Sequence, residues 1–217
     1  MRAAGRCLVW MWLALCLPGS AMAGVVFHDS ATHRFTGAAG SGISIGAYGI
    51  TGGTASFSAD ITGSWNPAAS FAGMIFNTTH GSPGPDLYVV QNFGGGCGTA
   101  GNFYWNSFDG CLNPFGALPG SVEDGSVHTV LVALDGTNHT THLYYDNALV
   151  GAANYVAPGS FLTIGGAGNG TQGWNGTIGN FTVYDSVVTP APLDAPGPTA
   201  LAAAVLALLW LRRRGWT

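Results

Sequence analysis

Residues 128–151 read HTVLVALDGTNHTTHLYYDNALVG, and this stretch decides the fold. An apolar run ends at the turn formers Asp135 and Gly136, and the chain then returns through a second run of apolar and β-branched residues. Asp146 and Asn147 can reverse the chain again, because asparagine tolerates a positive φ. The stretch therefore predicts consecutive antiparallel strands joined by tight turns.

An alternation of apolar and polar side chains marks a strand earlier in the chain, where residues 56–61 read SFSADI. Successive side chains of a strand point to opposite faces, so Phe57, Ala59 and Ile61 share the buried face. Similar runs, separated by turn formers, occur at 43–48, 71–77, 86–92, 101–105, 129–134, 140–145, 161–165 and 177–184. In the last of these runs the alternation of apolar and polar residues is interrupted at Gly179, which indicates a bulge.

The composition predicts an all-β chain. Glycine occurs 35 times, β-branched and aromatic residues are common, and strong helix formers are scarce between the two ends. Many short strands favour a sandwich or jelly roll over a membrane barrel, because runs such as Val130 to Leu134 are apolar on both faces. We expect one such domain over residues 24–188.

The second half of the domain resembles the bacterial LamG-like type of the concanavalin A-like lectin/glucanase superfamily. The resemblance is carried by His128 opening a strand, Asp135-Gly136, LYYD at 143–146, LTIGG at 162–166 and NGTIGNFTVYD at 175–185. The family's hairpin usually turns on Asp-Gly, and this chain has Asn147 in place of the glycine. The resemblance implies a two-sheet jelly-roll β-sandwich that recognises glycans or proteins, often with calcium.

The amino end has the three parts of a secretory signal peptide. Arg2 and Arg6 precede an apolar run from Leu8 to Leu17, and a small-x-small site ends at Ala23. A retained anchor is disfavoured, because this apolar run is about half of the ~20 residues that a spanning helix needs. We expect residues 1–23 to be removed by cleavage between Ala23 and Gly24.

The carboxyl end reads as a transient membrane anchor. A proline-rich linker at 189–199 leads into an apolar run at 200–211, and the basic residues Arg212, Arg213 and Arg214 follow within the tail 212–217. A helix over 200–211 would be about 18 Å long and short of a ~30 Å hydrocarbon core. The arginines predict a cytoplasmic tail and an external domain.

This three-part end resembles the PEP-CTERM sorting signal that exosortases process in Gram-negative bacteria. Pro196 and Pro198 lie in the sequence APGP, where the family most often has Pro-Glu-Pro. The resemblance implies an exosortase-type partner and delivery to the cell envelope, the cell surface or the exterior.

The charges exclude some classes of function. Residues 24–188 carry eight Asp and Glu123 against Arg34 alone, which gives nine minus one, or a net charge of −8. Such a body repels phosphate backbones, so we expect no nucleic-acid binding. A glycosidase needs two carboxyl groups at the scissile bond, usually glutamates in this superfamily, and Glu123 is the only glutamate. We therefore expect no catalysis.

Aromatic side chains in or beside predicted loops are candidates for stacking on a sugar. The candidate ligand-binding residues are Trp65, Tyr104, Trp105, Asn106 and Asp109. For each aromatic ring, burial in the core is the open alternative.

Cys97 and Cys111 flank four of those candidates. They are the two cysteines that remain after signal cleavage, and in an exported protein such a pair predicts a disulfide. Calcium accepts carboxylate and carbonyl oxygens, so Asp60, Asp124 and Asp185 are candidate calcium ligands.

The sequence supports one leading hypothesis, an exported, surface-sorted bacterial protein whose domain binds a carbohydrate or another surface component without catalysis. A structural protein of the extracellular matrix or biofilm, with no dedicated ligand, is the alternative. A glycan hydrolase that uses a pair of aspartates is the least favoured hypothesis.

Overall fold

The computed structural model describes residues 23–64, 72–79, 86–90, 103–105, 115, 122–167 and 172–190. All regular secondary structure in these ranges is β-strand, as the sequence predicts. The strands are β1 Val25–Asp29, β2 His33–Thr36, β3 Ile43–Gly46, β4 Ala55–Gly63, β5 Ala72–Asn77, β6 Asp86–Val90, β7 Phe103–Trp105, β8 His128–Asp135, β9 Thr140–Tyr145, β10 Ala148–Asn154, β11 Leu162–Ile164 and β12 Asn175–Tyr184.

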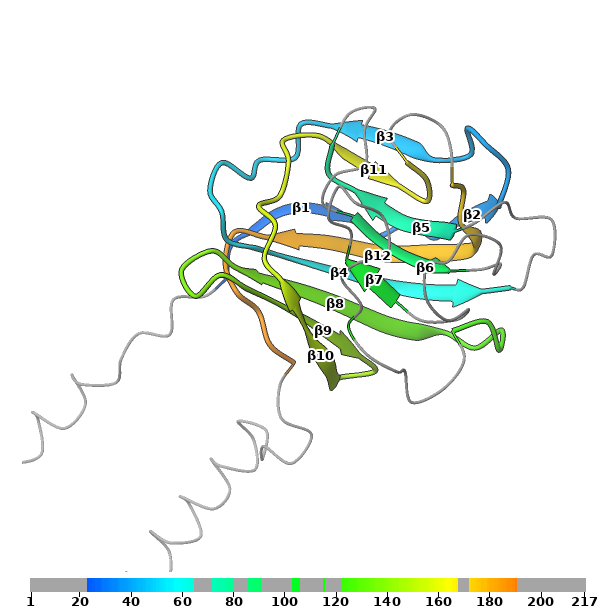
Figure 1. Ribbon diagram of the computed structural model, residues 1–217. Helices are drawn as coiled ribbons and strands as arrows, with labels where there is room; N and C mark the ends of the chain where they lie inside the picture. The colour runs from blue at the N-terminus through cyan, green and yellow to red at the C-terminus, as the bar shows by residue number, and fades with distance from the viewer. Residues whose placement is uncertain are drawn as a thin grey trace, which may run out of the picture.

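The strands form two antiparallel sheets that lie face to face (Figure 1). Sheet A has the order β1-β12-β4-β8-β9-β10, with β2 also paired to β12, and sheet B has the order β3-β11-β5-β6-β7. Strands far apart in sequence are neighbours, as where β4 lies between β12 and β8. The predicted jelly-roll β-sandwich is confirmed.

The stretch at 128–151 forms the strands β8, β9 and β10 of sheet A, of which the sequence predicts the first two and the turn that follows β9. Strand β8 pairs with β9, and β9 pairs with β10. Asp146 and Asn147 connect β9 to β10 with φ values of 49° and 67°. Two consecutive positive φ values are typical of the tight hairpin turn whose twist matches that of the strands. The bulge in β12 is also confirmed, since its register with β4 shifts between Gly179 and Thr182.

The core lies between the sheets and is rich in aromatic rings. Phe57 of β4 stacks on Phe76 of β5 with the ring centroids 4.7 Å apart, so this pair joins the two sheets. Phe181 of β12 meets Phe76 edge-on at 5.6 Å. The predicted alternation in β4 is confirmed, because Phe57, Ala59 and Ile61 are all buried. Each large apolar side chain buried in this way contributes about 1.5–3 kcal/mol.

Three strands, β1, β2 and β10, lie outside the sequence predictions. Strands β1 and β10 are the edges of sheet A, and β2 pairs with β12 alone. Most of their residues are exposed or half-buried, so their apolar side chains do not follow a clear alternation. The periodic signal is weak where only one side of a strand is paired and neither face is fully covered.

The chain that follows β12 crosses the outer face of β4. Ser56 points outward, yet it is fully buried. Its hydroxyl donates a hydrogen bond to the carbonyl of Ser186 at 2.8 Å and accepts one from the amide of Val188 at 2.8 Å. The segment after Tyr184 is therefore fixed to the sheet before the predicted linker begins.

Several sequence predictions lie outside the described residues. They concern most of the signal peptide at 1–22, the cysteines Cys97 and Cys111, the sorting-signal residues Pro196 and Pro198, the apolar run at 200–211 and Arg212, Arg213 and Arg214. Among the residues that are described, no helix has the length and apolar character required to span a membrane.

Candidate functional site

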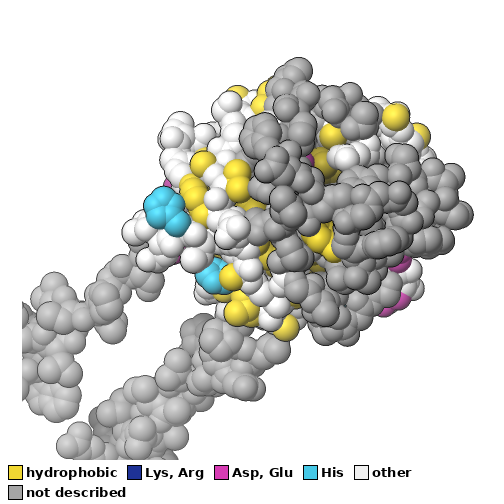
Figure 2. Space-filling view, viewed as in Figure 1, with side chains coloured by type: hydrophobic (Ala, Val, Ile, Leu, Met, Phe, Trp, Pro, Cys, Tyr) yellow, Lys and Arg dark blue, Asp and Glu magenta, His cyan; other side chains and the backbone are white. Residues whose placement is uncertain are grey.

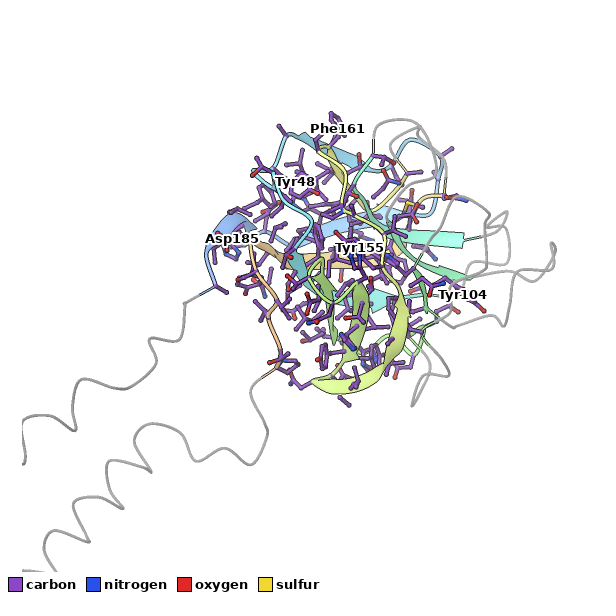
Figure 3. All side chains as sticks on the ribbon, turned by 60° about the vertical axis from the view of Figure 1, so that its left-hand side comes forward. Tyr48, Tyr104, Tyr155, Phe161 and Asp185 are labelled. Carbon is purple, nitrogen blue, oxygen red and sulfur yellow. The ribbon has the colours of Figure 1, made fainter. Side chains whose placement is uncertain are left out.

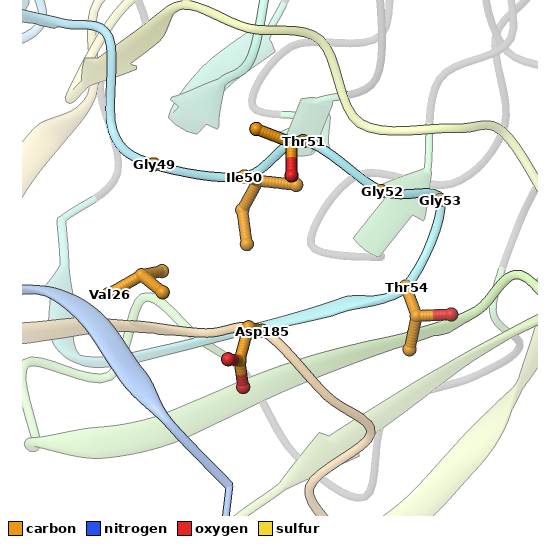
Figure 4. A pocket seen from close by; sticks show the side chains of 8 residues that line it. All are labelled: Val26, Gly49, Ile50, Thr51, Gly52, Gly53, Thr54 and Asp185. Carbon is orange, nitrogen blue, oxygen red and sulfur yellow. The ribbon is translucent and has the colours of Figure 1, made fainter.

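A glycine-rich loop forms one wall of a cavity at the end of the sandwich where β4 begins. Residues 49–54 read GITGGT, and with Val26 and Asp185 they line a cavity of about 340 Å³ (Figure 4). The side chains of Val26 and Ile50 point toward the space between the loop and sheet A, and Asp185 lies across from the loop. The volume falls at the small end of the range for ligand pockets.

The loop is held at both of its ends. On one side Tyr48 is buried in the core, its ring 5.9 Å from that of Phe57, and its hydroxyl donates a hydrogen bond to the carbonyl of Gly159. On the other side the hydroxyl of Tyr155 donates to the carbonyl of Gly53. Burial raises the pKa of Tyr48, so this hydroxyl stays a neutral donor at physiological pH.

The β8–β9 loop supports the same wall. The amide of Gly136 donates to the hydroxyl of Thr54 at 3.2 Å. A Cβ at residue 136 would lie 2.8 Å from the carbonyl of Gly53, so the two loops meet through their backbones. Asp135 shapes the β8–β9 loop by accepting hydrogen bonds from the backbone and side-chain amides of Asn138 and from the backbone amide of Thr137, and these bonds lower the pKa of its carboxyl. A cavity wall made in this way needs no ligand to organise it.

Asp185 closes the cavity beside the amino end of the domain. Its carboxylate oxygen Oδ1 accepts the amide of Gly24 at 2.9 Å, and its own amide donates to the carbonyl of Gly24 at 3.0 Å. Figure 3 shows Asp185 at one end of the domain and Tyr104 toward the other. Asp185 thus marks the place where both chain ends of the described domain meet.

The cavity is lined by backbone groups of the glycine-rich loop, by Thr51 and Thr54, by one carboxylate and by two aliphatic side chains. A few converging polar groups beside apolar surface suit a small hydroxylated ligand. Glycoside hydrolysis uses two carboxyl groups, and among the described residues that line the cavity Asp185 is the one carboxylate.

The three predicted calcium ligands do not come together. Asp185 follows the end of β12 that pairs with the start of β4, whereas Asp124 bridges to Ser64, just beyond the end of β4. Asp60 accepts hydrogen bonds from the hydroxyl of Thr129 at 3.0 Å and the amide side chain of Asn180 at 2.6 Å. No group of three or more His, Cys, Asp or Glu in the described part of the chain could hold a metal ion.

Asp124 belongs instead to a cluster around His128. The His128 ring lies between two carboxylates, with Nδ1 2.8 Å from Asp146 and Nε2 3.1 Å from Asp124, and it stacks on Tyr145 at 4.7 Å. Partial burial favours the neutral ring, but the hydrogen bonds to Asp146 and Asp124 outweigh it and raise the pKa of His128. Burial also raises the pKa of the Tyr145 hydroxyl. The cluster joins the start of β8 to the β9–β10 turn.

The predicted sugar-stacking residues fall into two groups. Tyr104 and Trp105 of β7 are 3% and 0% exposed, and the ring of Trp105 lies 6.1 Å from that of Phe76 in the core. The open alternative of core burial thus describes Trp105, which belongs to the core cluster. Tyr104 is buried as well, but as the neighbouring residue of β7 it points to the opposite face of sheet B. Trp65, Asn106 and Asp109 lie outside the described residues.

Sequence reasoning missed the loop at 49–54. Its glycines and threonines look like an ordinary connection, and no aromatic or charged residue marks it. The hydroxyl contact from Tyr155, about 100 residues further along the chain, gives the loop its fixed shape. A contact at that separation leaves no local pattern in the sequence.

No known family model and no curated protein matches the sequence. Among solved structures, the chain is similar to a leech intramolecular trans-sialidase complexed with 2,7-anhydro-Neu5Ac, with a TM-score of 0.52 and 17% identity over 77% of this chain and 27% of that one. It is also similar to a heptameric SAP-like pentraxin from Limulus polyphemus, with a TM-score of 0.51 and 16% identity over 73% of this chain and 77% of that one. The chain thus corresponds to about a quarter of the leech protein's length. At these identities the likeness establishes a shared jelly-roll β-sandwich and leaves the activity open.

Proposed function

We propose that the protein is an exported, non-catalytic carbohydrate-binding β-sandwich of the LamG-like type, and that the cavity beside residues 49–54 holds its ligand. The observation that carries this proposal is the cavity's lining. Backbone groups and threonine hydroxyls can hydrogen-bond the hydroxyls of a sugar, while Val26 and Ile50 contact its apolar face. A single carboxylate at the cavity supports binding rather than hydrolysis.

Two further observations narrow the class of ligand. The leech trans-sialidase, which shares the fold over part of its length, is complexed with 2,7-anhydro-Neu5Ac, and this supports a saccharide. The domain at 24–188 carries a net charge of −8, so it repels acidic polymers at a distance. We therefore propose a neutral glycan of the extracellular matrix or cell surface as the ligand.

The positions of the first and last residues of the domain support an exported protein that is attached to the membrane at one end of the sandwich. Gly24 and Asp185 are hydrogen-bonded neighbours, so the leader and the carboxyl-terminal segment both attach at the same end of the sandwich. We propose that the leader is cleaved after Ala23, that the run at 200–211 holds the chain briefly in the membrane, and that an exosortase-type enzyme processes it. Mass spectrometry of the cell-associated protein tests this, because an intact Arg212 to Thr217 would contradict sorting by cleavage.

A glycan array probed with recombinant residues 24–188, with and without calcium, tests the binding function. We expect selective and saturable binding of a neutral glycan. Loss of binding on removal of calcium would add a metal to the site. A blank array would overturn the proposal and favour a structural matrix protein, and release of reducing sugar would show a hydrolase.

Two variants test the place of binding. Gly52→Trp should abolish it, because a Cβ at residue 52 meets no atom within 4 Å and the indole can extend over the cavity without unfolding the domain. Thr51→Val removes one hydroxyl and should weaken binding about fivefold, equivalent to about 1 kcal/mol. Thr137→Val, on the exposed β8–β9 loop, is the matched control and should bind as the wild type does. Unchanged binding by Gly52→Trp would place the ligand elsewhere.

A further inference from the structure

The backbone nitrogen of Gly24 points at a carboxylate. It lies 2.9 Å from Oδ1 of Asp185, and the amide of Asp185 donates in return to the carbonyl of Gly24 at 3.0 Å. This reciprocal pair continues the ladder between β1 and β12, in which Val25 is opposite Tyr184. The position of the Gly24 nitrogen is therefore set by the sheet and by the side chain together.

Glycine at residue 24 lets the carboxylate lie this close, because any larger residue would make the Asp185 side chain shift. A Cβ at residue 24 would lie 2.7 Å from Oδ2 of Asp185 and 3.0 Å from both its Cγ and Oδ1, so the carboxylate packs directly against the Cα of Gly24. The partner is fixed as well, because Ser56 holds the next residue, Ser186, and then Val188 against the outer face of β4. Two independent constraints thus bring one nitrogen and one carboxylate together.

The sequence predicts cleavage at this same nitrogen. Hydrolysis of the Ala23–Gly24 bond consumes one water, leaves a carboxylate on Ala23 of the departing leader and frees an amine on Gly24, which takes up a proton at neutral pH. We propose that Asp185 is the binding site for the chain's own new amino terminus, where cleavage converts an amide hydrogen bond into an ammonium–carboxylate pair. The inference rests on the export step of the proposed function.

The charges of the domain favour this pairing. Arg34 is the only Lys or Arg in residues 24–188, so the new ammonium becomes the second fixed positive charge of a strongly acidic body. On the face seen in Figure 2, acidic and histidine side chains of the described residues are exposed, and no basic side chain of those residues is visible. Arg34 is in β2, opposite Thr177 near the start of β12, whereas Asp185 follows the end of that strand. No Lys or Arg of the domain therefore competes with the terminus for Asp185.

The pairing also fixes one wall of the cavity. Asp185 and Val26 both line it, and they lie on either side of the Gly24 contact. In the precursor a neutral amide holds this junction, whereas in the processed chain a charge-assisted hydrogen bond holds it more strongly. Removal of the leader thus strengthens the contact between Gly24 and Asp185 at the edge of sheet A.

The test compares the chain from Gly24 to Thr217 in a mild detergent with a free or an acetylated amino terminus. A protease that cuts directly before a glycine produces the free form, and acetylation removes the charge while keeping the N–H donor. We expect the free form to melt about 1–3 °C higher, as for an exposed ion pair in a domain of this size. Backbone amides of β1 should also exchange hydrogen more slowly in the free form.

Asp185→Asn supplies the decisive comparison. In this variant acetylation should no longer change the melting temperature, whereas in the matched control Asp135→Asn the acetylation effect should persist. An equal acetylation effect in Asp185→Asn, or none in the wild type, would overturn the proposal. These measurements use no glycan, so they succeed or fail independently of the binding function. Sequencing of the exported protein's amino end shows separately whether cells cut before Gly24.

Discussion

The two ends of the sandwich handle polar groups in different ways. At the loop end, made of residues 49–54 with Gly24, Tyr155 and Asp185, small residues let backbones meet and leave a cavity. At the histidine end, around His128, the carboxylates of Asp124 and Asp146 are both hydrogen-bonded to the imidazole that lies between them. Charged side chains that pair with one another stabilise the fold at the histidine end, whereas backbone groups beside open space at the loop end can accept a ligand.

Strand β4 connects the two ends and explains why they differ. At its start, Ala55 follows the loop at 49–54 and pairs with Leu134, so the neighbouring β8–β9 loop packs on the cavity wall. At its other end, Gly63 pairs with Gly176 of β12, close to the buried ring of Trp174. Space is available at the first end and is filled at the second.

The largest expected effect is on folding stability, when a single methyl group is added at each end of the sandwich in turn. A Cβ at Gly176, whose φ is 146°, would lie 1.8 Å from the carbonyl oxygen of Thr62, an atom of the paired backbone that cannot turn aside. Gly176→Ala should therefore lower the free energy of unfolding by about 3 kcal/mol or more, or prevent folding. At the loop end, Gly52→Ala meets no atom within 4 Å and should stay within about 0.5 kcal/mol of the wild type.

Chemical denaturation of the two variants measures the difference. Because both changes are glycine to alanine, they alter the unfolded chain in the same way, and the contrast reports the folded state alone. Equal losses of stability at the two positions would mean that the loop end is as tightly filled as the histidine end.

A smaller effect is expected from the contact that shapes the loop end. Tyr155→Phe removes the hydroxyl that donates to the carbonyl of Gly53 and should cost about 1 kcal/mol of folding stability. It should also weaken glycan binding, because the loop at 49–54 loses the support at its far end. Tyr144→Phe, on the outer face of β9, is the control and should change neither quantity. Lower folding stability with unchanged glycan binding would show that the Tyr155 contact, which shapes the loop at 49–54, is not needed for binding.

How far the sequence predicts this molecule depends on the range of the interactions. Local patterns suffice for the alternation in β4, for the Asp146-Asn147 turn and for the bulge after Gly179, because each rests on neighbours within a few residues. Burial of Trp105 cannot be read in the same way, since a tryptophan beside a glycine-rich stretch fits a binding loop as well as a core strand.

The candidate site depends on long-range contacts. Gly24 and Asp185 are 161 residues apart, and Gly53 and Tyr155 are 102 apart, so no periodicity links the members of either pair. Asp185 appeared in the sequence only as one of several acidic residues that could bind calcium. Its place beside the amino end follows from the pairing of β1 with β12, which weak edge-strand signals do not reveal.

The smallest effect concerns pH and belongs to the histidine end. The pKa of His128 is raised in the folded protein by Asp146 and Asp124, against the effect of partial burial, while Tyr145 covers one face of the ring. The folded state therefore binds this proton more tightly than the unfolded state. The stabilisation is complete below the unfolded pKa of about 6.5 and is lost as pH rises through the folded value.

Denaturation of the wild type and His128→Gln at a series of pH values measures this loss. The difference in unfolding free energy between the two proteins should shrink as pH rises from about 6 to 8. Asp124 has a lowered pKa, from the Ser126 amide and from His128, so its own contribution disappears only as pH falls below about 4, outside that window. In Asp146→Asn the pH dependence should be weaker, because one of the two carboxylates that favour the charged ring is gone. A difference that stays constant across the window would show that the imidazole joins β8 to the β9–β10 turn in its neutral form, and that the contrast between the two ends of the sandwich lies in packing rather than in charge.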